Sequence, residues 1–169
     1  MQPHAIDTGY LGDRLAIQDL IARYFRGIDR ADPALVRSCF TDDVEAIYAG
    51  RPAVRGIGAL MDSLQPFFES LETGKTKTTT HFMGNFSIVT LESNLAETET
   101  YALTFHVRPG DAGDRVAIRS LRYLDRLRRV GGNWLIGTRQ HTLDWSSEAP
   151  AISAVTKATR LSQLPPGMA

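Results

Sequence analysis

The chain has 169 residues, 43% of them hydrophobic and 22% charged, so it is long enough for one globular domain with a substantial core. Its 19 basic and 19 acidic residues cancel, which argues against a nucleic-acid or membrane-surface partner. The single cysteine, Cys39, excludes an internal disulfide and a cysteine-based zinc site, and its apolar surroundings predict a packed core thiol.

A local cluster of arginines lies between residues 119 and 129. Few aromatic residues flank it, so the solvated face of a strand is a better interpretation than a nucleic-acid patch. The cluster consists of Arg119, Arg122, Arg126, Arg128 and Arg129.

No stretch has the apolar run of a signal peptide or a membrane span, and we therefore expect a cytoplasmic protein.

Residues 1–12 are polar and contain glycine, which predicts a flexible N-terminal arm. Residues 15–29 predict an amphipathic helix with Asp13 as its N-cap, because apolar side chains recur at steps of three and four residues. Its apolar face consists of Ile17, Leu20, Ile21, Tyr24, Phe25 and Ile28.

Asp32-Pro33 has the pattern of a second helix start, with a capping aspartate and proline in the first helical position. This helix is expected to include Cys39 and Phe40 on its apolar face and to lead into a short strand at residues 44–48. Residues 56–71 predict a third helix, in which Pro66 predicts a kink or a split.

From Lys75 onward the hydrophobic period changes to two, which is typical of strands. Four long strands are predicted, at residues 76–91, 95–108, 115–130 and 133–145, with Gly131-Gly132 as a hairpin turn between the last two. Residues 13–145 would then form one α+β domain, a cone-shaped barrel in which a curved mixed or antiparallel sheet wraps over three N-terminal helices. Residues 146–169 would be a tail, either a lid, an oligomer arm or a frayed end.

Asp29 and His81 are the first candidates for chemistry. An aspartate at a helix C-terminus is poorly placed, because the carbonyl end of the helix dipole is negative. His81 lies in the middle of a predicted strand, where a lone histidine is more often a structural hydrogen-bonding group than a catalyst. Paired with a carboxylate, however, it could accept a proton at neutral pH.

Arg139 shares a strand face with Leu135 and His141, and an arginine on an apolar face must be paired. It could neutralise a carboxylate or hold a substrate oxygen, and the sequence leaves both open. Tyr24 and Tyr48 could be core residues or site hydroxyls.

Tyr101 and His106 have opposite parity in one predicted strand, so at most one of them should face the interior. A metal site made of His81, His106, His141 and a carboxylate is disfavoured, since the three histidines come from separate strands without local ligand spacing. We expect neither a metal nor a cofactor.

The element order, together with four motifs, resembles the SnoaL-like branch of the nuclear-transport-factor-2-like (NTF2-like) superfamily over about residues 15–145. That superfamily contains dehydratases, dehydrochlorinases, isomerases, cyclases, epoxide hydrolases and binding proteins, so the fold does not specify the function. The resemblance implies a homodimer or homotrimer formed through the outer sheet face. The motifs are Tyr24 five residues before Asp29, Thr80-His81-Phe82, Tyr123-Leu124-Asp125-Arg126 before Gly131-Gly132-Asn133-Trp134, and Trp134 five residues before Arg139.

Within the dehydratase-type branch, which includes scytalone dehydratase, bile-acid dehydratase and hexachlorocyclohexane dehydrochlorinase, a His–Asp dyad abstracts a carbon-bound proton. Asp29 and His81 match that dyad in position. Tyr24 matches a tyrosine of the bile-acid enzyme, where the dehydrochlorinase has lysine, and Arg139 matches an arginine in the last strand of both. Tyr48 and His106 fall near a tyrosine and a second histidine of scytalone dehydratase.

A strand aspartate of the bile-acid enzyme has no clear counterpart here, which leaves the leaving-group acid unassigned. The polar residues near that position are Glu97, Glu99, Tyr101 and Thr104.

The resemblance implies a cofactor-independent lyase that acts on a hydrophobic cyclic substrate, steroid-like or polyketide-like. His81 would be the base, Asp29 would orient it, and Tyr24 with Arg139 or Tyr48 would polarise a carbonyl or protonate the leaving hydroxyl. Two alternatives remain: a ketosteroid-isomerase-like proton shuttle, which needs a free carboxylate base, and a non-catalytic module that binds a small molecule or a subunit. The residues expected to contact the substrate are Tyr48, His106, Tyr101, Phe25 and Phe67.

Overall fold

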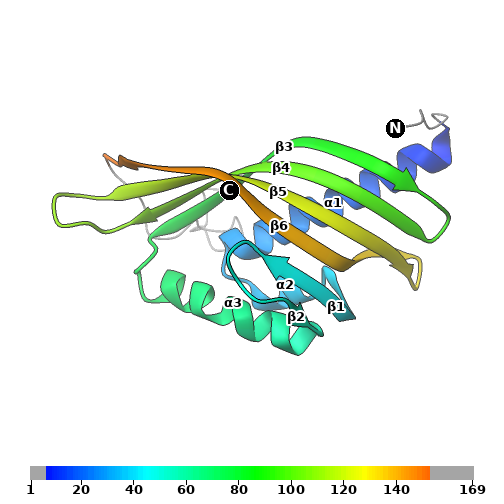
Figure 1. Cartoon of the computed structure of the whole chain (residues 1–169), viewed down its shortest axis with the longest axis horizontal. Coiled ribbons are helices and arrows are strands. Elements are labelled where there is room, and N and C mark those ends of the chain that lie inside the picture. Colours follow the sequence, from blue (N-terminus) through cyan, green and yellow to red (C-terminus); the bar gives the residue numbers. More distant parts are fainter. Residues whose placement is uncertain (1–6, 153–169) are drawn as a thin grey trace, which may run out of the picture.

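The computed structural model describes residues 7–152, which form an open six-stranded sheet with three helices (Figure 1). The strand order is β2-β1-β6-β5-β4-β3, in which β1 and β6 run parallel and all other neighbours antiparallel. The predicted α+β class with a curved mixed sheet is confirmed, and the sheet does not close on itself, since β2 and β3 are its two edge strands. The elements are α1 (Thr8–Asp29), α2 (Pro33–Arg37), β1 (Phe40–Tyr48), β2 (Val54–Arg55), α3 (Ile57–Glu72), β3 (Thr78–Leu91), β4 (Leu95–Arg108), β5 (Arg115–Val130) and β6 (Asn133–Pro150).

Helix α1 begins at Thr8, earlier than predicted, because Asp7 and not Asp13 is its N-cap. The Asp7 carboxylate accepts a hydrogen bond from the Tyr10 backbone N–H at 2.8 Å. Residues 8–12 therefore belong to the helix and not to an arm. Asp13 instead contacts the sheet: it accepts a hydrogen bond from the Trp134 indole at 3.1 Å and pairs with Arg129.

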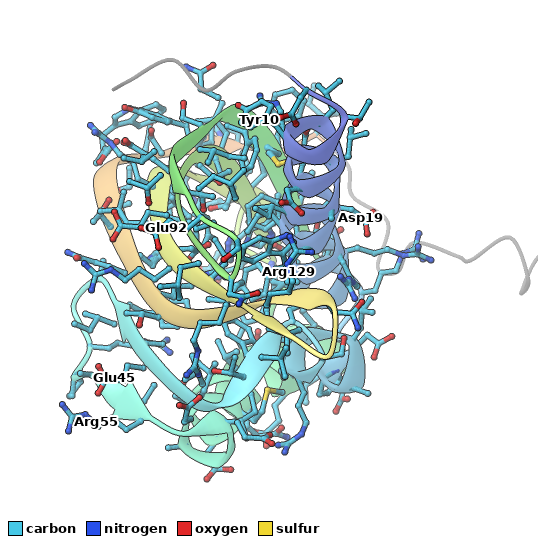
Figure 2. All side chains as sticks on the ribbon, turned by 90° about the vertical axis from the view of Figure 1, so that its right-hand side faces the viewer. Tyr10, Asp19, Glu45, Arg55, Glu92 and Arg129 are labelled. Atoms are coloured by element: carbon cyan, nitrogen blue, oxygen red, sulfur yellow. The ribbon has the colours of Figure 1, made fainter. Side chains whose placement is uncertain are left out.

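The predicted apolar face of α1 is buried in full against the concave side of the sheet. Figure 2, a view turned by 90°, shows the strands curving around α1, with Asp19 on the side of the helix that is turned away from them. Helix α2 crosses α1 at Gly27, where an added Cβ would lie 2.7 Å from Val36 Cγ2. A glycine is needed there because the two helices approach too closely for a side chain.

Several predicted boundaries differ from the structure. Helix α2 ends at Arg37, so Cys39 lies between helix and strand, although its thiol is buried as expected. Phe40 opens β1 because it pairs in register with Ile136 of β6. Pro66 does not split α3, and the two-residue strand β2 was not predicted.

Strand β6 continues past the predicted end at residue 145 to Pro150, because its partner β5 extends equally far. Residues 146–150 are thus part of the sheet and not a tail. The rest of the predicted tail, from residue 153, and residues 1–6 of the predicted arm lie outside the described residues.

The outer face of the sheet exposes large apolar side chains. Phe82, Leu103, Ser120 and Trp145 are paired in register from β3 to β6, and Phe82 and Trp145 are 63% and 52% exposed. The homodimer or homotrimer remains a prediction, and this row is where we would place its contact. Within residues 7–152, no helix is both long and apolar enough to span a membrane.

Candidate active site

Residues of opposite parity on the long strands face opposite sides of the sheet. On β4, Thr98, Thr100, Ala102, Thr104 and His106 are buried beneath the helices. Residues paired in register across the strands share a face, so the concave face is organised in cross-strand rows. One row consists of His81, Thr104, Arg119 and Ser146, a second of Phe86, Thr100, Tyr123, His141 and Tyr48, and a third of Ile88, Thr98, Asp125, Arg139 and Ala46.

Asp29, the last residue of α1, binds His81 of β3 through two hydrogen bonds. The His81 ring Nδ1 lies 2.6 Å from Asp29 Oδ1, and the His81 backbone N–H donates to Asp29 Oδ2 at 2.9 Å. Since a carboxylate accepts, Nδ1 carries the hydrogen and Nε2 is left with a free lone pair. The misplaced helix-end aspartate is thus compensated by two donors, and the imidazole is fixed in the tautomer of a general base.

Aromatic groups enclose the His81 ring, whose side chain is only 6% exposed. Phe25 stacks on it with centroids 5.2 Å apart and planes 27° apart, and the His106 ring lies at 6.2 Å. Phe67 of α3 lies 5.4 Å from His106. Burial, with smaller contributions from the charges of His81 and two arginines, lowers the pKa of His106 to about 3. His106 is therefore neutral at physiological pH.

A second polar group lies further along the concave face. The Tyr24 and Tyr48 hydroxyls are 3.1 Å apart, and the Tyr48 ring packs on His141 at 5.2 Å. The Ala49 N–H donates to His141 Nδ1 at 3.4 Å, so this neutral imidazole carries its hydrogen on Nε2. Burial, followed by the charge of Arg139, lowers the pKa of His141 to about 4, and burial raises the pKa of the Tyr24 phenol.

Arg139 forms a buried ion pair with Asp125 on the adjacent strand. Its Nε and Nη2 donate to the two carboxylate oxygens at 2.8 and 2.7 Å, and both side chains are 0% exposed. Its guanidinium carbon lies 4.1 Å from the centre of the Tyr24 ring. Of the two roles left open, this geometry favours neutralisation of a carboxylate, with only Nη1 unpaired.

Tyr101 does not join these residues, contrary to the prediction that it contacts substrate. It lies on the outer face beside Arg122, whose guanidinium carbon is 4.8 Å from its ring centre, because the parity of β4 turns His106 inward instead. Glu97 and Glu99 also face outward and pair with arginines of β5. Of the four polar residues near the unmatched strand aspartate, only Thr104 is on the concave face.

Sequence reasoning did not assign three concave-face residues of strand β5 to the site region. The period-two pattern of residues 115–130 would have found all three, because Arg119, Tyr123 and Asp125 share the parity of the buried Leu121 and Leu127. Treating the arginines of β5 as one solvated group hid the difference between Arg119, which faces inward, and Arg122, which faces outward.

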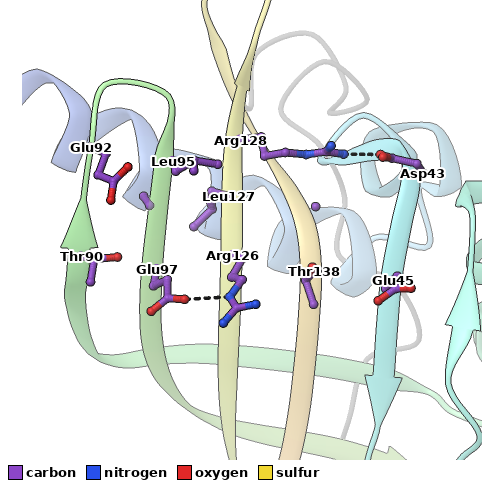
Figure 3. A pocket seen from close by; sticks show the side chains of 12 residues that line it. Asp43, Glu45, Thr90, Glu92, Leu95, Glu97, Arg126, Leu127, Arg128 and Thr138 are labelled. Carbon is purple, nitrogen blue, oxygen red and sulfur yellow. Dashed lines mark hydrogen bonds and ion pairs between the residues drawn. The ribbon is translucent and has the colours of Figure 1, made fainter.

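A hollow of about 570 Å³ lies on the outer side of the sheet and is separate from this site (Figure 3). Two of its four carboxylates pair with arginines of the same lining: Glu97 pairs with Arg126 at 2.7 Å, and Asp43 pairs with Arg128. The described residues contain no group of three or more His, Cys, Asp or Glu side chains arranged to hold a metal ion.

An open, curved α+β sheet wrapped over helices is the fold of the NTF2-like class of proteins. Residues 9–140 match the model of the SnoaL-like domain, and the chain belongs to that family. Comparison with curated proteins gives no match.

Solved structures show the same fold at low sequence identity. A provisionally named scytalone dehydratase from Novosphingobium aromaticivorans is similar at 20% identity, with a TM-score of 0.72 over 89% of this chain and 96% of that one. A type 2 hexachlorocyclohexane dehydrochlorinase has 18% identity and a TM-score of 0.71 over 94% and 97%. An NTF2-like protein with a cystatin-like fold, also from N. aromaticivorans, has 24% identity and a TM-score of 0.62 over 80% and 84%.

Proposed function

We propose that this protein is a cofactor-independent lyase of the dehydratase type, which removes water from a hydrophobic cyclic substrate. The observation that carries the proposal is the two-point contact of Asp29 with His81, which leaves Nε2 of a buried imidazole free to accept a proton. Two similar structures are named as a dehydratase and a dehydrochlorinase, and both reactions are eliminations.

In this mechanism His81 takes a proton from the carbon next to a carbonyl, and the electron pair moves onto the carbonyl oxygen. Asp29 stabilises the imidazolium that forms. The Tyr24–Tyr48 hydroxyl pair is assigned to the carbonyl oxygen, since Tyr48 is the partly exposed member and its O–H can donate. Collapse of the enolate then forms the carbon–carbon double bond and breaks the carbon–oxygen bond.

The leaving hydroxyl needs a proton, and the outward-facing Glu97 and Glu99 cannot supply it. The His81 imidazolium, which holds the proton just removed, is the acid that we assign to this step. The hydroxyl leaves as water, and His81 returns to its neutral form. Arg139 is assigned a supporting role through its contact with the Tyr24 ring. Its pairing with Asp125 leaves it little capacity to hold the substrate directly.

Isomerisation is less well supported than elimination. A ketosteroid-isomerase-like shuttle would use a free carboxylate as its base, but both oxygens of Asp29 are engaged by His81. A non-catalytic binding module would not require this pairing. Analysis of the products separates elimination from isomerisation, since only elimination releases water.

The test is turnover of a panel of cyclic β-hydroxy ketones, followed by the absorbance of the conjugated enone. We expect His81→Ala to lower kcat/KM by at least about 10²-fold. Asp29→Asn should also lower it, because the His81 ring is then no longer held in the tautomer that leaves Nε2 free to accept a proton. Glu97→Gln, on the outer face, is the matched control and should leave turnover unchanged. Full activity in His81→Ala would remove His81 as the base.

A further inference from the structure

Arg119 is a cation on the concave face for which the described residues provide no counter-charge. It is half-buried on β5, and its register partners are Thr104 on β4 and Ser146 on β6. Thr104 is 0% exposed and is itself paired with His81, so these side chains point to the same side of the sheet. Arg119 is therefore two strands from the proposed base, a distance of about 10 Å between backbones.

The acidic side chains near Arg119 are engaged elsewhere. Glu148 of β6 pairs with Arg115, and Asp144 pairs with Arg122 on the outer face. Asp29 is held by His81, and Asp125 by Arg139. The ion pairs of the described residues thus leave Arg119 out, although a partly buried guanidinium gains from an anionic partner.

The groups beside Arg119 are uncharged hydrogen-bonding groups without partners. The Thr104 hydroxyl and Nδ1 of His106 are buried and make no hydrogen bond within the described residues. His106 is the next inward-facing residue after Thr104 on β4. After burial and the charge of His81, the charge of Arg119 is the next cause that lowers the pKa of His106, which agrees with the placement of both residues on the concave face.

We propose that Arg119, with the Thr104 hydroxyl beside it, binds a carboxylate carried by the cyclic substrate. This inference rests on the proposed function of the His81 site and names its substrate class. One unpaired cation balances a single negative charge, which favours a carboxylate over a phosphate dianion. The planar fork of the guanidinium matches a carboxylate through two parallel hydrogen bonds.

Binding of 2-naphthoate and of its neutral isostere 2-naphthamide, measured by calorimetry on the full chain, tests the proposal. Wild-type protein should bind naphthoate at least tenfold more tightly than naphthamide. Arg119→Gln should abolish that preference while naphthamide binding stays within about twofold, and Arg119→Lys should restore part of it because lysine keeps the charge but not the fork.

Arg122→Gln is the matched control, because Arg122 is an arginine of the same strand that faces outward and is paired with Glu99 and Asp144. It should retain the preference for naphthoate. Retention of the preference in Arg119→Gln, absence of a preference in the wild type, or absence of binding of either compound would overturn the proposal. Far-UV circular dichroism and the melting temperature of Arg119→Gln show that the variant is folded.

A His81→Gln variant in the same experiment separates this proposal from the proposed function. If His81 is not a base but Arg119 binds carboxylates, His81→Gln keeps the naphthoate preference and no β-hydroxy ketone is turned over. If His81 is the base but Arg119 has no such role, turnover depends on His81, and the naphthoate preference is absent or unaffected by Arg119→Gln.

Discussion

Replacing Asp125 by asparagine isolates the buried charge of Arg139. The asparagine keeps the size of the side chain but supplies one acceptor in place of two, and its amide group faces the guanidinium donors. Because both partners are 0% exposed, water cannot take over the lost interaction. Breaking a buried pair from one side typically costs about 3–5 kcal/mol. For a domain of this size that corresponds to a fall in Tm of about 6–20 °C.

The assay is urea unfolding, followed by far-UV circular dichroism, of wild type, Asp125→Asn and a double variant, Asp125→Leu with Arg139→Met. In the double variant no charge is left unpaired, and what is lost is the packing of Arg139 on the Tyr24 and Tyr123 rings, at centroid distances of 4.1 and 4.7 Å. We expect it to be about 1–2 kcal/mol less stable than wild type, and so more stable than Asp125→Asn. An Asp125→Asn variant within about 1 kcal/mol of wild type, or a double variant no better than the single one, would refute the reasoning.

Four further substitutions test other parts of the structure. Gly27→Ala should destabilise the protein by about 1–3 kcal/mol, because the added methyl group meets Val36. Gly12→Ala, in the same helix with open space around it, should stabilise the protein by up to about 1 kcal/mol. Thermal melts compare the two variants, and equal effects would contradict the close approach of α1 and α2. Asp7→Ala should cost about 1 kcal/mol through loss of the N-cap, and a melt identical to wild type would place the helix start elsewhere. His106, with its pKa lowered to about 3, stays neutral in the folded protein, whereas the same residue in the unfolded chain takes up a proton below about pH 6.5, so the free energy of unfolding falls with acidification. In His106→Asn, urea titrations should show that the loss of stability between about pH 6.5 and 5 is about 1–2 kcal/mol smaller than in wild type. An unchanged loss would exclude His106 as its source.

The architecture was largely predictable because its periodicities are clear. The apolar residues of α1 recur at helical spacing, and buried and exposed residues alternate along the long strands over more than a dozen residues each. Burial of one face of each element therefore leaves little choice of fold class. The pairing of β1 with β6 and the extension of β6 to Pro150 depend on contacts between distant segments, which a local pattern does not contain. The start of α1 was misplaced because Asp7 and Asp13 are both good capping residues, and Asp13 is engaged by Trp134 and Arg129.

Pairing across space also decided which candidate site residues meet. The electrostatic misfit of Asp29 indicated a partner, and the structure places His81 at 2.6 Å from it. Tyr101 was misassigned because the parity of a strand becomes known only when one of its residues is fixed to a face. The partner of Arg139 was not identified from sequence either, because a buried arginine requires a counter-charge without specifying which carboxylate supplies it.

The position of β6 between β1 and β5 has a consequence for how the chain reaches its folded state. Strands β3 to β6 are joined by short connections and pair with their sequence neighbours, so this meander can form from local contacts. β1 has only the two-residue β2 for a partner until β6 has been synthesised, about ninety residues later. The N-terminal third should therefore leave the ribosome before the strands that cover the apolar face of α1 exist, and α1 can dock only after the meander has formed.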